Sequence, residues 1–361
     1  MSDQSVPGSQ PISRRLFQQQ LTQAAAASLL AGGLAGCESR MVITPAPKAS
    51  GTAAAPSPGA TPAPAGGGPI VIGMIAKSQS NPVFLAARKG AEVRAAELST
   101  ELKRSIKIDW RTPNDEDPQK QAEFIEQLVS AGANAIVIAC SDASKVTRVI
   151  DDAIAKGTVV MCFDSDAPES KRLCYVGTDD VEAGRLVMRN TAELIGDKEG
   201  VVAILAGNQT ATNLQRRVRG AEEELAKHPK LKLKQVYYHK ETPQDAFAEV
   251  ESVQKANPEI NGWAMVGGWP LMTERALPWP QGEVACVSMD TLLPQLQHLR
   301  MGDVQVLLGQ RYFYFGGQCV NVLVDKLVHQ KDPANLIEFA PLDRVTKENV
   351  DDYAKNWEQW S

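Results

Sequence analysis

The sequence predicts an α/β fold of two lobes, each built around a doubly wound parallel sheet. Three observations lead to this prediction. From residue 70 onward, short β-branched apolar runs alternate with stretches of helical periodicity. After residue 200 the alternation restarts as a second, similar series. Polar side chains follow the carboxyl ends of successive runs, which is where open α/β sheets bind ligands.

The segment ahead of residue 69 is predicted to be a targeting region rather than part of the fold. Arg14 and Arg15 precede an Ala-rich apolar run over 24–35, which is too short to span a membrane as a stable helix. Residues 1–36 are therefore typical of a signal peptide. The arginine pair resembles a twin-arginine motif, which directs export of folded proteins.

Cys37 ends a Leu-Ala-Gly-Cys motif that resembles the lipobox of bacterial lipoproteins, in which the cysteine is acylated. The alternative is a chance cysteine after an ordinary signal. Residues 37–68 are rich in Pro, Ala, Gly, Ser and Thr, which predicts a flexible, lipid-anchored tether; a degradable tail is the other interpretation. We therefore expect the folded body in the periplasm or at the outer face of the cytoplasmic membrane.

Charge and cysteine content limit the function classes. The formal net charge is -5 and no basic cluster occurs, so a nucleic-acid surface is not expected. Of the 6 cysteines, 6 - 1 = 5 follow Cys37, and this odd number argues against a complete disulfide framework. Cys162 and Cys174 could pair across the intervening loop, but buried free thiols are the favoured interpretation.

The first series opens with a strand over 70–75 and a helix from Val83. Asn81 suits the cap of this helix and Pro82 its first position. The same alternation continues as far as residue 195, as expected for the first lobe. Further strands are predicted over 106–110, 135–140, 158–163 and 175–177, and further helices over 118–130, 143–155 and 181–195.

The second series repeats this pattern, which predicts the second lobe. After it, the segment 345–361 carries apolar residues near helical spacing, and we expect it to pack on the second lobe or to bind a partner. The strands of the series are predicted over 201–207, 233–239, 262–266, 283–289 and 304–309, and the helices over 213–226 and 243–255.

Carboxylates, amides, arginines and an aromatic ring collect at the predicted strand ends. Two such edges facing each other would form a cleft suited to a polyhydroxylated ligand, because each hydroxyl both donates and accepts hydrogen bonds. An aromatic face would cover the apolar C–H patch of a sugar ring. The strand-end residues are Lys77 to Asn81, Ser141, Asp142, Asp164, Ser165, Asp166, Asn208, Gln209, Gly267 to Trp269, Asp290, Gln310 and Arg311.

Several of these residues also have a simpler interpretation. Asp142 fits a helix cap as well as a ligand contact, and Asp179 and Asp180 fit caps better. The site interpretation of Asp164, Asp290 and Gln310 depends on their coincidence at strand ends. The other tryptophans are expected to pack or to lie at the surface: Trp110, Trp263, Trp279, Trp357 and Trp360.

Six motifs occur in the order and spacing of a known family: IGMIAKSQSNPVFLAARKGAE, VVMCFDSDAP, YVGTDDVEAG, NLQRRVRGAEEEL, VACVSMD and LLGQ. Together they resemble periplasmic sugar-binding proteins of the ribose-binding type. The resemblance implies a type I periplasmic binding protein, with two Rossmann-like lobes and parallel sheets joined by a three-stranded hinge. The N-terminal lobe would contain 69–177 plus 311–335, and the C-terminal lobe 178–310 plus 336–361.

The resemblance also implies site residues. Asn81 matches the Asn of the first turn, Phe84 a stacking aromatic, and Arg217 the sugar-binding Arg of the second lobe. Asp164, Asp290 and Gln310 match further sugar-binding positions. Lys77, Ser165 and Trp269, which follow predicted strands, complete the set. The predicted ligand-binding residues are Lys77, Asn81, Phe84, Asp164, Ser165, Arg217, Trp269, Asp290 and Gln310.

The sequence departs from the family pattern at three places. Val83 replaces the first of two paired aromatics, and Gly267 and Gly268 replace a polar residue. Trp269 is therefore a candidate for the missing stacking surface. Lys77 replaces a small polar residue, and it either donates to the ligand or faces solvent.

The resemblance implies a binding protein that delivers a pentose, hexose or deoxyhexose to an ABC transporter permease. We expect a monomer with no catalysis, no cofactor, no metal and no nucleic-acid partner. Two alternatives remain open. One is a sensor that presents its ligand to a membrane receptor. The other is an exported sugar-acting enzyme, against which the chain carries no nucleophile elbow, phosphate loop or metal-spaced histidine cluster.

Overall fold

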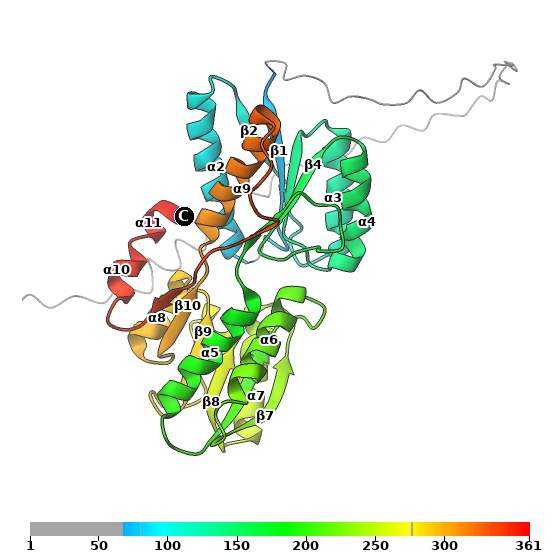
Figure 1. Ribbon diagram of the computed structural model, residues 1–361. Coiled ribbons are helices and arrows are strands. Elements are labelled where there is room, and N and C mark those ends of the chain that lie inside the picture. The colour runs from blue at the N-terminus through cyan, green and yellow to red at the C-terminus, as the bar shows by residue number, and fades with distance from the viewer. Residues whose placement is uncertain (1–67, 80, 276) are drawn as a thin grey trace, which may run out of the picture. The chain divides into compact units, whose positions relative to one another are not determined.

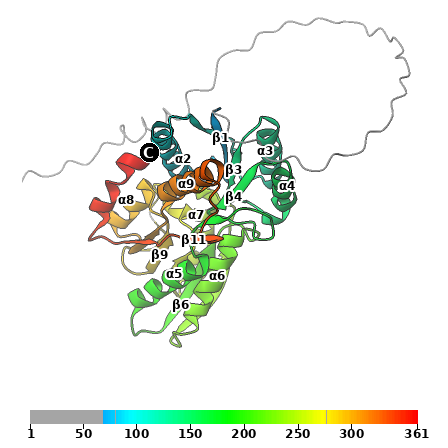
Figure 2. The same cartoon turned by 45° about the horizontal axis from the view of Figure 1, so that its top comes forward.

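The computed structural model describes residues 68–79, 81–275 and 277–361. The expected signal peptide, Cys37 and nearly all of the expected tether lie outside these residues. Within them, two six-stranded sheets are covered by helices (Figures 1 and 2). None of the helices described has both the length and the apolar character needed to cross a membrane.

The first sheet is parallel throughout and has the strand order β11-β5-β4-β3-β1-β2. Helices α2 and α9 pack on one face, and α3 and α4 on the other. The elements of this lobe are β1 (Ile70–Ile75), α2 (Val83–Glu101), β2 (Ile106–Trp110), α3 (Pro118–Ser130), β3 (Ala135–Ile138), α4 (Ala143–Ala155), β4 (Val159–Phe163), β5 (Tyr175–Gly177), α9 (Tyr312–His329) and β11 (Ile337–Phe339).

The second sheet has the order β12-β10-β9-β8-β6-β7, and only β12 runs antiparallel to its neighbour. Helices α5 and α6 pack on one face, and α7 and α8 on the other. The elements are α5 (Asp180–Ile195), β6 (Gly200–Ala206), α6 (Thr212–Leu225), β7 (Leu231–Tyr238), α7 (Pro243–Ala256), β8 (Ile260–Met265), η1 (Trp269–Met272), β9 (Ala285–Met289), α8 (Leu293–Met301), β10 (Val306–Gly309), β12 (Asp343–Val345), α10 (Val350–Ala354) and α11 (Trp357–Trp360).

The predicted fold class is confirmed, and most element bounds differ from the expected ones by one or two residues. Helix α2 begins at Val83 rather than at Pro82, and the Oδ1 atom of Asn81 accepts the backbone N–H of Val83 at 3.3 Å. The expected lobe boundary at residue 336 does not match the sheets. Strand β11 pairs with β5 in the first sheet, and the chain joins the second sheet only at β12.

Both lobes pack a pair of helices through glycines. A Cβ on Gly316 of α9 would overlap the carbonyl oxygen of Ala87 on α2, and Gly90 of α2 makes the reciprocal approach to α9. In the second lobe, a Cβ on Gly184 of α5 would overlap the backbone of α6, and a Cβ on Gly220 of α6 would overlap the backbone of α5. Only a residue without a side chain allows backbones this close, so these glycines set the spacing of both helix pairs.

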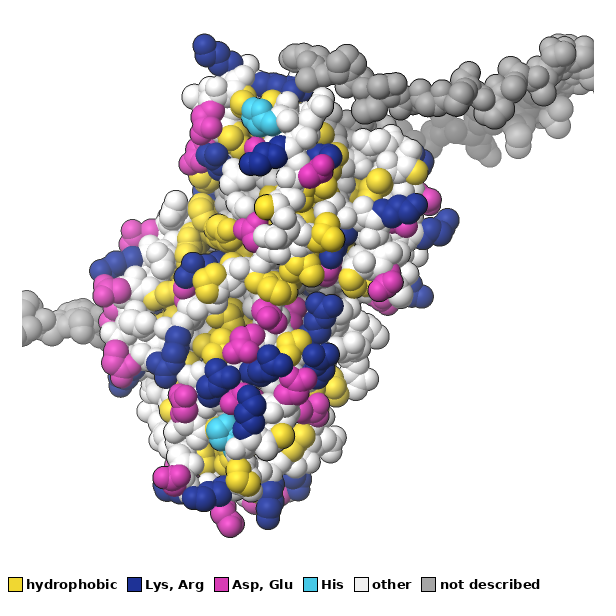
Figure 3. Space-filling view, viewed as in Figure 1, with side chains coloured by type: hydrophobic (Ala, Val, Ile, Leu, Met, Phe, Trp, Pro, Cys, Tyr) yellow, Lys and Arg dark blue, Asp and Glu magenta, His cyan; other side chains and the backbone are white. Residues whose placement is uncertain are grey.

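The five cysteines of the described residues are buried and free. Cys162 and Cys174 therefore do not pair with each other, in agreement with the favoured interpretation. The nearest thiols are those of Cys140 and Cys162, whose sulfur atoms lie 3.9 Å apart. On the surface seen in Figure 3, Lys and Arg side chains are interspersed with Asp and Glu.

Candidate functional site

Asp164 and Asp290 occupy equivalent places in the two sheets. Asp164 follows β4 and Asp290 follows β9, and both have left-handed backbones with φ of 57° and 71°. This backbone region is uncommon for residues other than glycine, although Asp tolerates it better than most. Both carboxylates are buried, and burial raises the pKa of each above its ordinary value, while Lys77 and Arg217 respectively oppose that rise.

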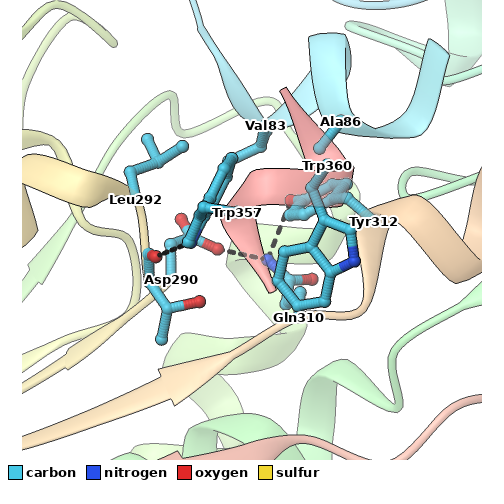
Figure 4. Close-up of a pocket in the computed structure, with 9 residues that line it drawn as sticks. Val83, Ala86, Asp290, Leu292, Gln310, Tyr312, Trp357 and Trp360 are labelled. Carbon is cyan, nitrogen blue, oxygen red and sulfur yellow. Dashed lines mark hydrogen bonds between the residues drawn. The ribbon is translucent and has the colours of Figure 1, made fainter. Parts of the chain in front are cut away.

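Gln310 follows β10 and uses the full hydrogen-bonding capacity of its amide. Its Oε1 atom accepts from Arg217 at 2.8 Å and from the Thr178 hydroxyl at 2.9 Å. Its Nε2 atom donates to Asp290 Oδ1 and to the Tyr312 hydroxyl, both at 2.8 Å (Figure 4). The amide is 4% exposed, so it joins two charged groups and two hydroxyls in a buried network.

Tyr312 connects this network to the first lobe. Its hydroxyl donates to Asp164 Oδ1 at 2.9 Å, and its ring meets that of Phe84 edge to face at 6.0 Å. Tyr312 thus links Asp164 to Gln310, which itself donates to Asp290. The sequence reasoning missed Tyr312, although its position two residues after Gln310 was a usable signal.

Arg217 is held by a carboxylate that the sequence analysis assigned differently. Its Nε atom donates to Asp180 Oδ1 at 2.9 Å, and both side chains are buried. The expected capping role is correct for Asp179, which accepts the N–H groups of Val181 and Glu182. It is wrong for Asp180, which orients Arg217 instead. Burial raises the pKa of Asp180 to about 7, against the opposing attraction of Arg217.

Lys77 lies in a second buried cluster of charges. Its Nζ atom is 3.2 Å from Glu116 Oε1 and 3.8 Å from Glu241 Oε2, and the residue is 3% exposed. The solvent-facing alternative for Lys77 is therefore wrong. Burial opposes its charge, but the two carboxylates outweigh that effect and raise the pKa of Lys77 above its ordinary value.

Glu241 links this cluster to the second lobe, since it follows β7 while Lys77 follows β1. Its Oε1 atom accepts the backbone N–H of Asn208 at 3.1 Å. Burial raises the pKa of Glu241 to about 7, against the attraction of Lys77. Glu116 and Glu241 were not predicted, although both lie shortly after predicted strands, where the strand-end rule would have found them.

The other predicted residues lie outside the hydrogen-bond network. Asn81 precedes α2 and accepts the Val83 N–H, Asp142 caps α4 by accepting the Ser144 N–H, and Ser165 is buried directly after Asp164. Trp269 is 7% exposed and meets the His239 ring edge-on at 5.3 Å. It packs in a separate small cluster with Ala211, Leu214 and Ala246.

A pocket opens beside Asp290, Gln310 and Tyr312 (Figure 4). It encloses about 10 Å³, close to the space of one water molecule. This pocket is therefore too small for a ligand larger than water in this arrangement. Its apolar lining comes from α2, α11 and the segment after β9: Val83, Ala86, Leu292, Trp357 and Trp360.

The family model described as "Periplasmic binding protein domain" matches residues 72–331. The chain belongs to this family of periplasmic binding proteins. The match covers strands of both sheets and all of the network around Gln310, and it confirms the resemblance seen in the motifs. Because the family is one of ligand-binding proteins, the match agrees with the expectation that the chain is not an enzyme.

Several periplasmic binding proteins are similar to this one. The D-apiose import binding protein of Actinobacillus succinogenes is 27% identical over 53% of this chain and 60% of its own length. The ribose import binding protein of Bacillus subtilis is 28% identical over 42% of this chain and 47% of its own length. The chain thus spans about half the length of these curated relatives.

A solved structure matches over more of the chain. It is an ABC transporter solute-binding protein of Burkholderia graminis in complex with D-arabinose, 26% identical, with a TM-score of 0.73. The match covers 79% of this chain and 98% of that one. A ribose ABC transporter protein of Conexibacter woesei, 22% identical with a TM-score of 0.68, shares the fold.

Proposed function

We propose that this protein binds a monosaccharide between its two lobes and delivers it to an ABC transporter permease. The observation that carries the proposal is the buried network in which Gln310 bonds to Asp290 directly and to Asp164 through Tyr312. Carboxylates accept from sugar hydroxyls, and amide and guanidinium groups donate to them. The names of the relatives, which bind or import pentoses, support the same ligand class.

In this proposal, hydrogen bonds to the ligand replace some of the hydrogen bonds between side chains of the network. Asp164 and Phe84 form the first-lobe wall, and Arg217, Asp290 and Gln310 the second-lobe wall. Lys77, Asn81 and Ser165 lie at the edge of the site. A monosaccharide is far larger than the 10 Å³ enclosed now, so the lobes must separate to admit it. A sugar that touches both walls then stabilises the closed arrangement by differential affinity.

The hinge in this proposal consists of the three segments that connect the sheets. They lie between β5 and α5, between β10 and α9, and between β11 and β12. Thr178 and Gln310, one on each of the first two segments, share a hydrogen bond of 2.9 Å. Closure and ligand contact are therefore coupled at the same residue, Gln310.

The sequence supports export and anchoring as part of the proposal. A twin-arginine signal over residues 1–36 would carry the folded protein across the membrane, and acylation of Cys37 would attach it to the outer face. The tether over 37–68 would let the body reach a permease in the same membrane.

Isothermal titration of the purified protein tests the binding function. The probes are D-ribose, D-arabinose, D-allose, D-apiose and xylitol. We expect saturable 1:1 binding of at least one of them, and mass spectrometry should recover the bound sugar unchanged. Absence of binding across this panel, or recovery of a chemically altered sugar, would contradict the proposal.

A further inference from the structure

The C-terminal segment connects the two lobes beside the candidate site. It lies beyond the family match, which ends at residue 331. Its first part belongs to the second lobe, where Val350 is in the core and the Tyr353 hydroxyl shares a 2.9 Å hydrogen bond with Thr291. Its last part reaches the first lobe, where the ring of Trp360 stacks on Phe313 of α9 at 6.5 Å and 20°.

Trp357 is fixed next to a predicted ligand residue. Its indole N–H donates to the backbone carbonyl of Thr291 at 2.8 Å, directly after Asp290. Its ring meets that of Trp360 edge to face at 5.5 Å. Both rings line the same pocket as Asp290 and Gln310 (Figure 4). The sequence analysis expected these tryptophans only to pack or to lie at the surface. The structure places both of them in the lining of the pocket as well.

The pocket is divided into a polar side and an apolar side. Asp290, Gln310 and Tyr312 form the polar side, and α2 contributes Val83 and Ala86 to the apolar side, which the two tryptophans complete. Two polar groups beside Trp357 already have partners. The Trp357 N–H is taken by the Thr291 carbonyl, and the Thr291 hydroxyl by Tyr353.

We propose that Trp357 and Trp360 form an aromatic wall of the ligand site and select sugars that present carbon-bound hydrogen to it. This inference rests on the proposed sugar-binding function. A C–H face gains contact with the rings. A hydroxyl directed at the ring faces would lose its water partners and find no hydrogen-bond partner on those faces. The wall therefore favours a pentose face or a deoxy position over a hydroxyl on that side.

Titration of single variants of the intact protein tests the wall. Trp357→Leu should weaken binding of the tightest panel sugar about three- to tenfold, the range expected for an aromatic contact, whereas Trp357→Phe should stay within about twofold. The matched control is Trp279→Leu, because Trp279 is also half-buried but stacks on Trp263 at 6.1 Å in the second lobe, away from the pocket. Trp279→Leu should leave the affinity unchanged.

A second measurement is made on the wild-type protein and uses variants only to assign signals. The protein is labelled with 5-fluorotryptophan, and the ¹⁹F signals of Trp357, Trp360 and Trp279 are assigned from single Trp→Phe variants. Saturation with the sugar should shift the first two signals and leave the third in place. Unshifted signals for Trp357 and Trp360, or equal affinities of Trp357→Leu and wild type, would overturn the wall. If no panel sugar binds the wild-type protein, the result contradicts the proposed sugar-binding function itself, and not the aromatic wall alone.

Discussion

Replacing Gln310 by Leu removes four hydrogen bonds from the centre of the site. Two of the partners, Arg217 and Asp290, are charged, and two, Thr178 and Tyr312, are hydroxyls. A hydrogen bond to a charged group contributes about 1.5–3 kcal/mol, and a neutral one about 0.5–1.5 kcal/mol. The simple sum is about 4–9 kcal/mol, but neighbouring groups re-pair and the contributions are not additive. We expect the free energy of unfolding to fall by about 3–5 kcal/mol.

Urea unfolding followed by circular dichroism measures this loss, which is a large share of the roughly 5–15 kcal/mol of a typical domain. Gln215→Leu is the matched control, because Gln215 is exposed on α6 and, among the residues that the structure describes, its side chain bonds to the Gln209 carbonyl alone. It should change stability by less than about 0.5 kcal/mol. A loss below about 1 kcal/mol for Gln310→Leu would refute the network as described, since a buried arginine and carboxylate cannot lose their shared partner at so small a cost.

Three further predictions concern the site, its pH dependence and the helix packing. Asp290→Asn should weaken sugar binding about 10- to 100-fold in calorimetry because a charged acceptor is lost; Asp142→Asn, at a strand end but outside the network, should not. Burial raises the pKa of Glu241 from 4.5 to about 7, so its contribution to stability is full below pH 4.5 and lost as the pH rises through 7. The melting temperature of the wild-type protein should therefore fall between pH 5 and 8, and Glu241→Gln should make this fall less steep. An unchanged slope in the variant would contradict this prediction. Gly316→Ala should lower the free energy of unfolding, measured in urea, by about 1–3 kcal/mol because the added Cβ overlaps α2. Gly317→Ala should not lower it, because its Cβ would meet nothing closer than 3.6 Å. Equal effects of the two variants would argue against the close packing of α9 on α2.

The fold was predictable because strand and helix periodicity is a local property of the chain. Strands such as 70–75 and 106–110 agree with the structure to the residue, since each is a short apolar run between turns. Strand β11 was not predicted to join the first sheet. Its residues, Ile337 to Phe339, are mostly exposed, so no burial pattern marks them as a sheet strand.

The clustering of candidate site residues was predictable where one rule applied repeatedly, and less so where hydrogen-bond partners come from distant segments. Asp164, Asp290 and Gln310 all follow strands, and parallel strands bring their carboxyl ends to one edge. Asp180 was assigned as a cap because it opens a helix, and only the tertiary structure shows Arg217 beside it. The tryptophans of α11 are brought to the pocket by a chain that crosses between lobes, which no local pattern encodes.

The hydrogen-bonding positions of the Gln310 amide are all occupied within the protein, and this affects how the site distinguishes ligands. Every donor and acceptor of this amide is already paired within the protein, so a sugar hydroxyl that enters replaces one hydrogen bond with another and gains little net energy. Exchange of this kind favours polyhydroxylated ligands as a class but discriminates weakly among them. Apolar contact with the rings of Trp357 and Trp360, which border the pocket, does not require a hydrogen bond to be exchanged. Discrimination between sugars of similar size is therefore expected to depend on the aromatic wall more than on the network, and Trp357→Leu should narrow the affinity differences across the panel while Asp290→Asn weakens all of its members together.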